Sequence, residues 1–405
     1  MDNLDSAEVT AFPYPRDMTR PFDPPPALQA AAARPGLTKV SIWDGSKAWL
    51  VTRYADSKAV LGDARFSADP TKPGFPEKSA GYKGSIGQDK NLRTMDDPEH
   101  AAEKRTVGRD FTVKRIQEMR PAIQAKVDGL IDDMLAKGPP ADIVHDFALP
   151  VPTMVICELL GVPYADREEF AERSYTCLSS EVSVEESTAA STALFDYVDR
   201  LIDIKDKAPS NDLMSRLVVD ELRTGQMTRK HIVDLARLVL IAGHETTANM
   251  IALSITALLR YPDQLALIKA DPSLVPNAVD ELLRFISVAH TGRRRAAIAD
   301  VEIGGQMIRA GEGVIVANSM ADSDDAVFDD ARTLDIRRLN ARATMAFGFG
   351  IHQCIGQLLS RVELQIVHST IWHRIPTLAL AIPFEDVPFR EDTSVYGVRN
   401  LPVTW

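Results

Sequence analysis

One long helical segment constrains this chain more than any other feature of its sequence. Helical periodicity runs from Arg229 to Arg260, with Thr228 as the predicted N-cap and Pro262 as the stop. At 1.5 Å per residue this helix is about 48 Å long, which is the width of a whole domain. A helix of that length must be packed on most sides, so polar residues at its centre need a reason.

The middle of this helix is apolar enough to be mistaken for a membrane span. Leu238 to Leu259 could cross a bilayer by length, but His244, Glu245 and Asn249 lie within it, and charge at bilayer depth is expensive. We therefore predict a buried helix and no membrane association. The first ten residues lack the basic start and apolar stretch of an export signal, which predicts a cytoplasmic protein.

Composition narrows the class of protein further. The 405 residues are 45% hydrophobic and 25% charged, which is typical of a globular protein and not of a disordered chain or a disulfide scaffold. A formal net charge of −11 argues against a nucleic-acid-binding protein. The three cysteines, Cys157, Cys177 and Cys354, are too few and too scattered for a disulfide framework or a zinc finger, and fit a reducing compartment.

The pattern of periodicity predicts a mainly α protein with a minor β region. Residues 1–35 contain seven prolines and are expected to form an extended arm, followed by a single domain over residues 36–405. Apolar residues alternate on both sides of Asp44-Gly45, which predicts a hairpin over Val40–Thr52, and a second β region is expected at Val301–Val316. Further helices are predicted at Ile116–Leu135, Val151–Leu160, Ala189–Lys205, Pro272–Phe285 and Ile355–His373.

A glycine-rich loop with a cysteine precedes the last of these helices. It runs from Phe347 through Gly350 and Cys354 to Gly356. Unpaired N–H groups and the helix dipole stabilise a thiolate at a helix N-terminus, and glycines let the backbone approach a large flat group. Phe347 and Phe349 are expected to shield the sulfur from water. These features suit a sulfur that binds a metal from one side; the alternative is a buried cysteine in a glycine-rich loop.

The pattern Phe-x-x-Gly-x-x-x-Cys-x-Gly resembles the signature of the cytochrome P-450 family of haem-thiolate monooxygenases. The resemblance implies the cytochrome P-450 fold, with the long central helix lying over a haem b whose iron is ligated by Cys354. It also implies a single catalytic domain over residues 36–405. His352 stands where the family usually has arginine and is expected to face a haem propionate.

Glu281 and Arg284 place a carboxylate and a guanidinium on one helical face. By itself this spacing is weak, because surface ion pairs of this kind arise by chance. In the family that the chain resembles, Glu-x-x-Arg is a buried pair tied to a later arginine below the haem. The position of the pair, 70 residues before Cys354, suits this structural role.

The centre of the long helix carries Ala242-Gly-His-Glu-Thr-Thr247. Glycine weakens a helix and a threonine hydroxyl can bond to the carbonyl four residues earlier, so local distortion is expected here. The resemblance assigns the acid–alcohol pair that relays protons to Glu245 and Thr246; the alternative is a buried polar cluster that satisfies itself. A zinc-binding helix is excluded because the residue four after His244 is Ala248.

The resemblance assigns several cations to the haem propionates. His100 follows the acidic start of a predicted helix, and the second cation, four residues on, is Lys104 with Arg105 next to it. Which of these two reaches the propionate stays open. Arg295, five residues before Asp300, matches the remaining propionate arginine of the family.

By the same analogy, two groups of residues face the substrate and the electron donor. Arg93 is expected to pair with a substrate carboxylate or to form a structural salt bridge. The predicted lining of an apolar pocket comprises Arg93, Leu240, Ile241, the segment 287–291 with Val288, Ala289 and Thr291, and Val395 with Tyr396. A basic run, which could attract an acidic ferredoxin or be a solvated helix face, comprises Lys104, Arg105, Arg109, Lys114 and Arg115.

The predicted activity is insertion of one atom of O₂ into an apolar small molecule by a monomeric enzyme. The two electrons are expected from a ferredoxin, because the chain has no flavin or nicotinamide fingerprint. One alternative is a nitric-oxide-reducing haem-thiolate enzyme that uses NAD(P)H directly, and Glu245 argues against it. Two others are a haem protein that only binds or senses a ligand and a haem-free helical protein. The sequence does not identify the substrate.

Overall fold

The computed structural model describes residues 11–79, 91–178, 183–390 and 395–405. Contacts divide the chain into two compact units, each assembled from separate stretches of sequence. The first, which we call the sheet unit, comprises residues 1–104, 261–355 and 389–397, and the second, the helical unit, comprises residues 105–260, 356–388 and 398–405. The single catalytic domain expected over residues 36–405 stays a prediction.

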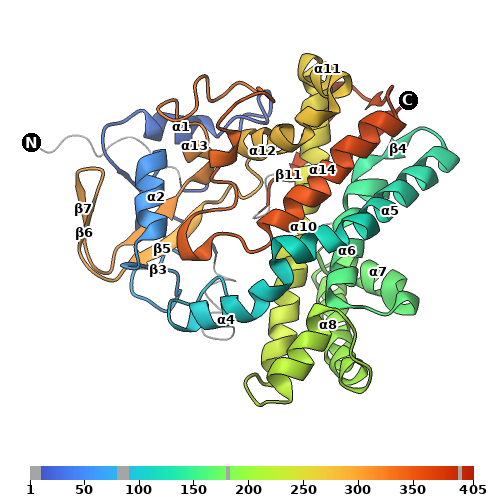
Figure 1. The fold of residues 1–405 in the computed structure, drawn as a ribbon. Coiled ribbons are helices and arrows are strands. Elements are labelled where there is room, and N and C mark those ends of the chain that lie inside the picture. Colours follow the sequence, from blue (N-terminus) through green and yellow to red (C-terminus); the bar gives the residue numbers. More distant parts are fainter. Residues whose placement is uncertain (1–10, 80–90, 179–182, 391–394) are drawn as a thin grey trace, which may run out of the picture. The chain divides into compact units, whose positions relative to one another are not determined.

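The sheet unit, drawn mainly in blue and orange in Figure 1, is built on a five-stranded sheet with the order β1-β2-β8-β5-β3. Only the β2–β8 pair is parallel, and β1–β2, β5–β8 and β3–β5 are antiparallel. The strands of this sheet are β1 (Thr38–Ser41), β2 (Lys47–Val51), β3 (Phe66–Ser67), β5 (Arg293–Ala297) and β8 (Gly313–Val316), and a separate hairpin is formed by β6 (Val301–Ile303) and β7 (Gln306–Ile308). The helices of this unit are α1 (Pro26–Ala32), α2 (Tyr54–Gly62), α11 (Pro262–Ala270), α12 (Val275–Phe285) and α13 (Asn318–Ala321).

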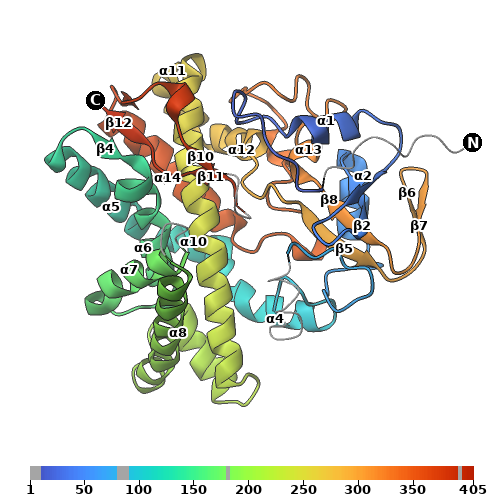
Figure 2. The same ribbon diagram turned by 180° about the vertical axis from the view of Figure 1, so that it is seen from behind.

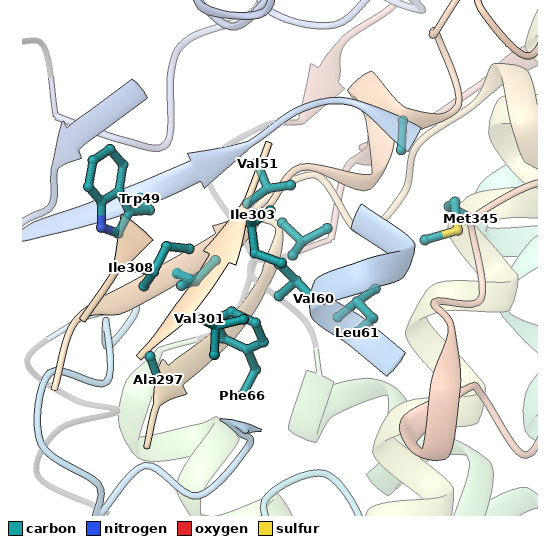
Figure 3. Close-up of a cluster of buried hydrophobic side chains, with 13 residues drawn as sticks. Trp49, Val51, Val60, Leu61, Phe66, Ala297, Val301, Ile303, Ile308 and Met345 are labelled. Carbon is teal, nitrogen blue, oxygen red and sulfur yellow. The ribbon is translucent and has the colours of Figure 1, made fainter. Parts of the chain in front are cut away.

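Period-2 alternation buries this sheet on both faces. Trp49 and Val51 of β2 pack into a core with Val60 and Leu61 of α2 (Figure 3), whereas Leu50 points into a second core with α1. The predicted hairpin is confirmed, because β1 and β2 pair around Gly45, which has a φ of 80°.

The expectation of a fully extended arm was wrong for its last part. Residues Pro26–Ala32 form α1, with Pro26 at the first helical position. Proline is well tolerated there, since that residue's N–H would have no partner inside the helix and its φ already suits one. Residues 1–10 lie outside the described part of the chain.

The helical unit is organised around α10 (Arg229–Arg260), which packs against α6, α8 and α14 (Figure 2). The predicted ends of α10 are confirmed: the Thr228 hydroxyl accepts the N–H of His231 at 3.2 Å, and Pro262 begins α11. The other helices of this unit are α5 (Val113–Lys137), α6 (Pro150–Leu160), α7 (Arg167–Leu178), α8 (Val184–Lys207), α9 (Leu213–Arg216) and α14 (Gln357–Arg374), while α4 (Glu99–Gly108) crosses the boundary between units. Short strands are β4 (Ala141–Asp142), β9 (Ala379–Leu380) and β12 (Pro402–Thr404) in this unit, with β10 (Phe389–Arg390) in the sheet unit and β11 (Gly397–Val398) on the boundary.

Two helical segments of the described chain, Ile143–Leu160 and Arg229–Arg260, are long and apolar enough to cross a membrane. Their apolar windows are 67% and 61% buried, and core helices pass the same test. This burial supports the prediction that the long helix belongs to the protein core.

A buried hydrogen-bond chain joins α10 to α14. The Trp372 indole N–H donates to Nδ1 of His368 at 3.1 Å, so the proton of this imidazole sits on Nε2, 2.9 Å from the Ser254 hydroxyl. The Ser254 hydroxyl donates in turn to the Ile251 carbonyl at 3.0 Å. Burial lowers the pKa of His368 to about 3. This imidazole cannot accept the serine proton. The hydrogen-bond chain therefore holds α10 and α14 together and does not activate a nucleophile.

Glu363, which lies on the same helix α14 as His368, has a buried carboxyl group. Glu363 is 3% exposed, and its Oε2 atom has no hydrogen-bond partner among the described residues. Burial alone raises its pKa to about 8, because the charged form is poorly solvated there. Glu363 is therefore mainly protonated at neutral pH.

Candidate active site

The cysteine loop leads directly into α14. Gly350 has a φ of 74°, and a Cβ at this position would lie 2.1 Å from the Leu61 carbonyl oxygen, so only glycine fits. The backbone N–H of Cys354 donates to the Phe347 carbonyl at 2.9 Å, which closes the loop. Gly356 is the N-cap of α14. The half-buried Cys354 thus lies two residues before the helix cap, and the predicted start of the helix at Ile355 is two residues too early.

The two phenylalanines of the loop have different surroundings. Phe349 packs against the hydrophobic core of the sheet unit, with its ring 4.7 Å from Lys58 Nζ and close to Gly62. The structure therefore assigns Phe349 to the core and not to a shield over the sulfur. Shielding by Phe347, which is half-buried, stays a prediction.

Of the two remaining cysteines, Cys157 is the one whose side chain the structure describes. Cys157 is 1% exposed, and burial raises the pKa of its thiol to about 12, which makes it an inert packing residue. The side chain of Cys177 lies outside the described part of the structure.

Two histidines lie together beside the cysteine loop. The rings of His100 and His352 have centroids 4.3 Å apart. Nδ1 of His352 is 3.2 Å from the Leu92 carbonyl and donates to it, which leaves Nε2 buried with no partner among the described residues. Burial, together with the charges of Arg295 and His100, lowers the pKa of His352 to about 4. A buried carboxylate next to Nε2 would reverse this effect by favouring the protonated ring.

Two further cations border the same loop. Arg295 is 7% exposed, and burial, with a contribution from Arg293, lowers its pKa to about 10, so the guanidinium remains charged at neutral pH. The Lys104 ammonium donates to the carbonyls of Ile351 and Gln353, the second at 3.4 Å. Burial lowers the pKa of Lys104, while the nearby Cys354 opposes this effect.

The structure distinguishes Lys104 from its neighbour. Lys104 is one helical turn after His100 and contacts the cysteine loop, whereas Arg105 is rotated away on α4 and is exposed. Lys104 is therefore the cation of this pair that lies at the loop.

The pair of Glu281 and Arg284 forms a buried cluster. Both side chains have 0% exposure, and Arg284 donates to both carboxylate oxygens at 2.7 Å. A later arginine, Arg338, places Nε 3.1 Å from the same two oxygens. The sequence-based expectation of a buried pair tied to a later arginine is confirmed, and the surface alternative is wrong.

This buried cluster continues to the cysteine loop through Asp322, a residue that no sequence motif marks. Arg284 donates to the Asp322 carbonyl at 2.7 Å. The Asp322 carboxyl accepts the backbone N–H of Met345 at 2.6 Å and the Thr344 hydroxyl at 3.1 Å. Burial raises the pKa of Asp322 to about 8, with these two hydrogen bonds acting against the increase. Asp322 thereby fixes the backbone two residues before the loop begins at Phe347.

The polar centre of α10 has the predicted back-bond. The Thr246 hydroxyl donates to the Ala242 carbonyl at 2.8 Å, and the Asn249 amide donates to the Glu245 carbonyl at 2.8 Å. Helix α10 runs without a break from Arg229 to Arg260, and the expected local distortion stays a prediction. A carbonyl oxygen has two lone pairs, so it can accept the hydroxyl without losing the helical N–H.

Burial differs along this part of α10. Ala242 is exposed and Glu245 and Thr246 are half-buried, whereas every residue from Thr247 to Leu258 is buried. His244 points into the core, and burial lowers its pKa to about 4. Glu245 and Thr246 thus lie where the partly exposed first half of α10 meets its buried second half.

The residues predicted to line a substrate pocket are spread over both units. Arg93 is exposed, Leu240 is buried, and the half-buried residues are Ile241, Val288, Ala289, Thr291 and Val395. Tyr396 is only 1% exposed: its hydroxyl donates to the Pro21 carbonyl at 2.8 Å, and Arg16 lies 4.0 Å above its ring. Tyr396 therefore anchors the N-terminal segment. Its backbone N–H also donates to the Val288 carbonyl at 2.8 Å, and its role in lining the pocket stays a prediction.

Within the sheet unit, the cysteine loop and the cations beside it are the groups expected of a haem-thiolate enzyme. A cytochrome P450 family model matches residues 184–375. The chain is 49% identical over 398 residues to cytochrome P450-SU2 of Streptomyces griseolus, covering 98% of both proteins, and 43% identical over 406 residues to a vitamin D3 dihydroxylase of the same species, covering 100% of both. It matches the crystal structure of cytochrome P450 MoxA from Nonomuraea recticatena, a CYP105 enzyme, with a TM-score of 0.94, 47% identity and 98% coverage of each chain.

The chain belongs to the cytochrome P450 family and is a bacterial P450 monooxygenase that acts on small molecules. The family and fold imply a haem b whose iron is ligated by cysteine. The described residues fit this group, which carries two carboxylates. His352 has a buried nitrogen that finds no hydrogen-bond partner in the described part of the chain, and the cations Lys104 and Arg295 lie beside the same loop.

Proposed function

We propose that this enzyme hydroxylates or epoxidises an apolar organic molecule with O₂ and two electrons from a ferredoxin and its reductase. The observation that carries the proposal is Cys354, half-buried in a glycine loop at the start of α14 and bordered by buried cations. The haem, when bound through a thiolate, supplies the activation of O₂.

We assign the haem-binding residues as follows. Cys354 ligates the iron, and Phe347, Gly350 and Gly356 shape the loop that carries the sulfur. The two carboxylates of the cofactor are held by His100, Lys104, Arg295 and His352. The buried Nε2 of His352 and the desolvated guanidinium of Arg295 support this assignment, because a carboxylate would stabilise the charged form of both. Glu281 and Arg284 act structurally.

Glu245 and Thr246 move protons toward the oxygen-binding side in this proposal. The Thr246 hydroxyl donates its own hydrogen to the Ala242 carbonyl, so its oxygen can accept a hydrogen bond from a water molecule. The half-buried Glu245 is one residue away and supplies a carboxyl group that exchanges protons with solvent.

Replacing Thr246 by alanine tests this relay. The variant should keep its haem and its carbon monoxide difference spectrum, because the Ala242 carbonyl retains its helical N–H. We expect product formed per NADH consumed to fall several-fold and hydrogen peroxide to rise, since proton delivery loses its hydroxyl. Both yields would be measured with a compound that shifts the haem spin state and is oxidised by the wild type.

Thr256→Ala is the matched control for this experiment. Thr256 lies on the same helix, is buried, and makes the same bond to the carbonyl four residues earlier, at 2.8 Å. Thr256→Ala should retain the wild-type product yield. An unchanged yield per electron in Thr246→Ala would remove Thr246 from the relay.

The electron donor is proposed to be an acidic ferredoxin in the cytoplasm. Exposed Arg105, Arg109 and Lys114 support this choice, as does the lack of a nicotinamide or flavin fingerprint in the sequence. Lys104 is excluded from this surface because its ammonium contacts the cysteine loop. Turnover that needs a ferredoxin and weakens with salt is the expected result; turnover of nitric oxide with NADH alone would contradict it.

A further inference from the structure

The irregular N-terminal segment that precedes α1 is folded around a buried guanidinium. Arg16 is only 7% exposed, although arginine is among the residue types that are least often buried. Its Nη1 atom donates to the Pro21 carbonyl at 3.2 Å and to the Asp23 carbonyl at 2.8 Å. Taking a charge out of water is unfavourable unless such hydrogen bonds compensate it. The burial of Arg16 therefore points to a position that the fold keeps fixed.

The same guanidinium contacts two segments from the other end of the chain. Its Nη2 atom donates to the Ser287 carbonyl at 3.4 Å, two residues after the end of α12. Its central carbon, Cζ, lies 4.0 Å from the centroid of the Tyr396 ring. A guanidinium over an aromatic face is attracted by the ring, and more strongly where water is excluded. Arg16 thus contacts both stretches of the sheet unit that are expected to line the substrate pocket, residues 287–291 and residues 395–396.

Tyr396 completes the connection between these three segments. Its hydroxyl donates to the Pro21 carbonyl at 2.8 Å, and its backbone N–H donates to the Val288 carbonyl at 2.8 Å. Each pair among the N-terminal segment, the 287–291 segment and Tyr396 is therefore joined by at least one hydrogen bond. Buried hydrogen bonds are expensive to leave unmade, so these segments keep their relative positions as long as Arg16 and Tyr396 are in place.

An aromatic cluster links the same segments by packing. The ring of Phe22 meets the ring of Phe389, in β10, edge to face with centroids 6.0 Å apart, and its centroid is 5.9 Å from that of Phe285, the last residue of α12. Phe389 stacks in turn on Tyr396, with centroids 6.1 Å apart and ring planes 6° apart. Aromatic pairs in these arrangements contribute beyond the area they bury. A displacement of the N-terminal segment would therefore disturb the end of α12 and Tyr396 together.

We propose that Arg16 is a positioning residue for substrate selectivity: it fixes the backbone at Ser287 and the ring of Tyr396, and so sets the spacing of the two stretches that are expected to line the pocket. This inference rests on the proposed function and deepens it, because it assigns part of the selectivity to the N-terminal segment. Arg16 acts through the carbonyl and the ring that it holds, without contact with the substrate. A misplacement of about 1 Å at a binding site can cost about a hundredfold in rate, so such a contact matters.

The test measures the Kd of azoles for the holoenzyme from the shift of the haem absorption band. Imidazole reports access to the iron alone, whereas the larger phenylimidazole and clotrimazole also contact the pocket lining. In Arg16→Met, which loses the charge and the donors, we expect the Kd of imidazole to stay within about twofold and that of the larger azoles to rise about fivefold, because they must order a loosened lining. Arg16→Lys keeps the charge but not the planar fork of donors, and should give an intermediate result.

Arg20→Met is the matched control, because Arg20 lies in the same segment with its side chain 65% exposed and pairs with Asp23 only at the surface. It should bind all three azoles like the wild type. If Arg16→Met does not fold, Tyr396→Phe decides: it keeps the ring and the backbone bond to Val288, loses the bond to Pro21, and should also weaken only the larger azoles.

Each variant would be titrated at a temperature at which circular dichroism shows it fully folded. A purely structural role of Arg16 would lower the unfolding temperature and leave the Kd ratio of large to small azoles unchanged, which would overturn the inference. Equal weakening of all three azoles would also overturn it. A wild-type protein without a carbon monoxide band and without an azole shift would instead contradict the proposed function, and the inference with it.

Discussion

Replacing Cys354 by serine is expected to abolish the carbon monoxide difference band that is diagnostic of thiolate ligation. A serine hydroxyl stays protonated at neutral pH and is a poor ligand for iron, so the sulfur's electron donation disappears. The loop itself should survive, because its closing hydrogen bond comes from the backbone N–H of residue 354 and not from the side chain. Haem content, the carbon monoxide spectrum and product formation would be measured on the purified variant.

Cys157→Ser is the control for this substitution. Cys157 is buried and its thiol pKa is raised to about 12, so it cannot supply a thiolate at neutral pH. The control should keep the band, at some cost in stability from burying a hydroxyl. A band that persists in Cys354→Ser would show that another residue ligates the iron and would remove the basis of the assignment.

Glu363→Gln should make the protein more resistant to alkaline pH. In the folded state burial raises the pKa of Glu363 to about 8, from an ordinary value of 4.5. Between pH 4.5 and pH 8 the folded form therefore keeps a proton that the unfolded form releases. The contribution of Glu363 to the free energy of unfolding is fully present below pH 4.5 and is lost as the pH rises toward 8. Relative to the glutamine variant, the wild type should lose up to about 5 kcal/mol of unfolding free energy across this window.

The measurement is chemical unfolding of the holoenzyme at several pH values between 5 and 9, followed by circular dichroism. Glu158→Gln is the control: burial opposes ionisation of Glu158, but Lys126 and Arg167 outweigh it and lower its pKa. The wild type should not lose stability relative to that variant as the pH rises. A constant difference between wild type and Glu363→Gln would mean that Glu363 is ionised in the fold.

Sequence features such as a helix cap, a proline stop and an Asp-Gly turn correctly predicted the helix and the hairpin that they border. Thr228 and Pro262 marked the limits of α10, and Asp44-Gly45 marked the first hairpin. Strand β5 was missed because its three arginines hide the apolar pattern of a buried strand. Helix α1 was missed because a proline that begins a helix resembles one that prevents it.

The candidate site was predictable only where its residues lie close together in sequence. The cysteine loop and the Glu281–Arg284 pair have fixed spacings, and the structure places them as expected. Asp322 was missed because its partners, Thr344 and Met345, are more than twenty residues away in sequence. The choice between Lys104 and Arg105 needed the rotation of α4, which sequence spacing alone does not give.

The buried cluster of Glu281, Arg284 and Arg338 limits how this sequence can drift over generations. Removing Glu281 alone leaves two guanidinium groups without their shared counterion. Removing either arginine leaves the buried carboxylate with less positive charge to compensate it. Breaking such a buried group typically costs about 3–5 kcal/mol, a large part of what keeps a domain folded. Replacing all three residues by apolar ones at equal stability requires several codons to change at once. Single mutations should therefore be selected against, and Glu281, Arg284 and Arg338 should be retained together.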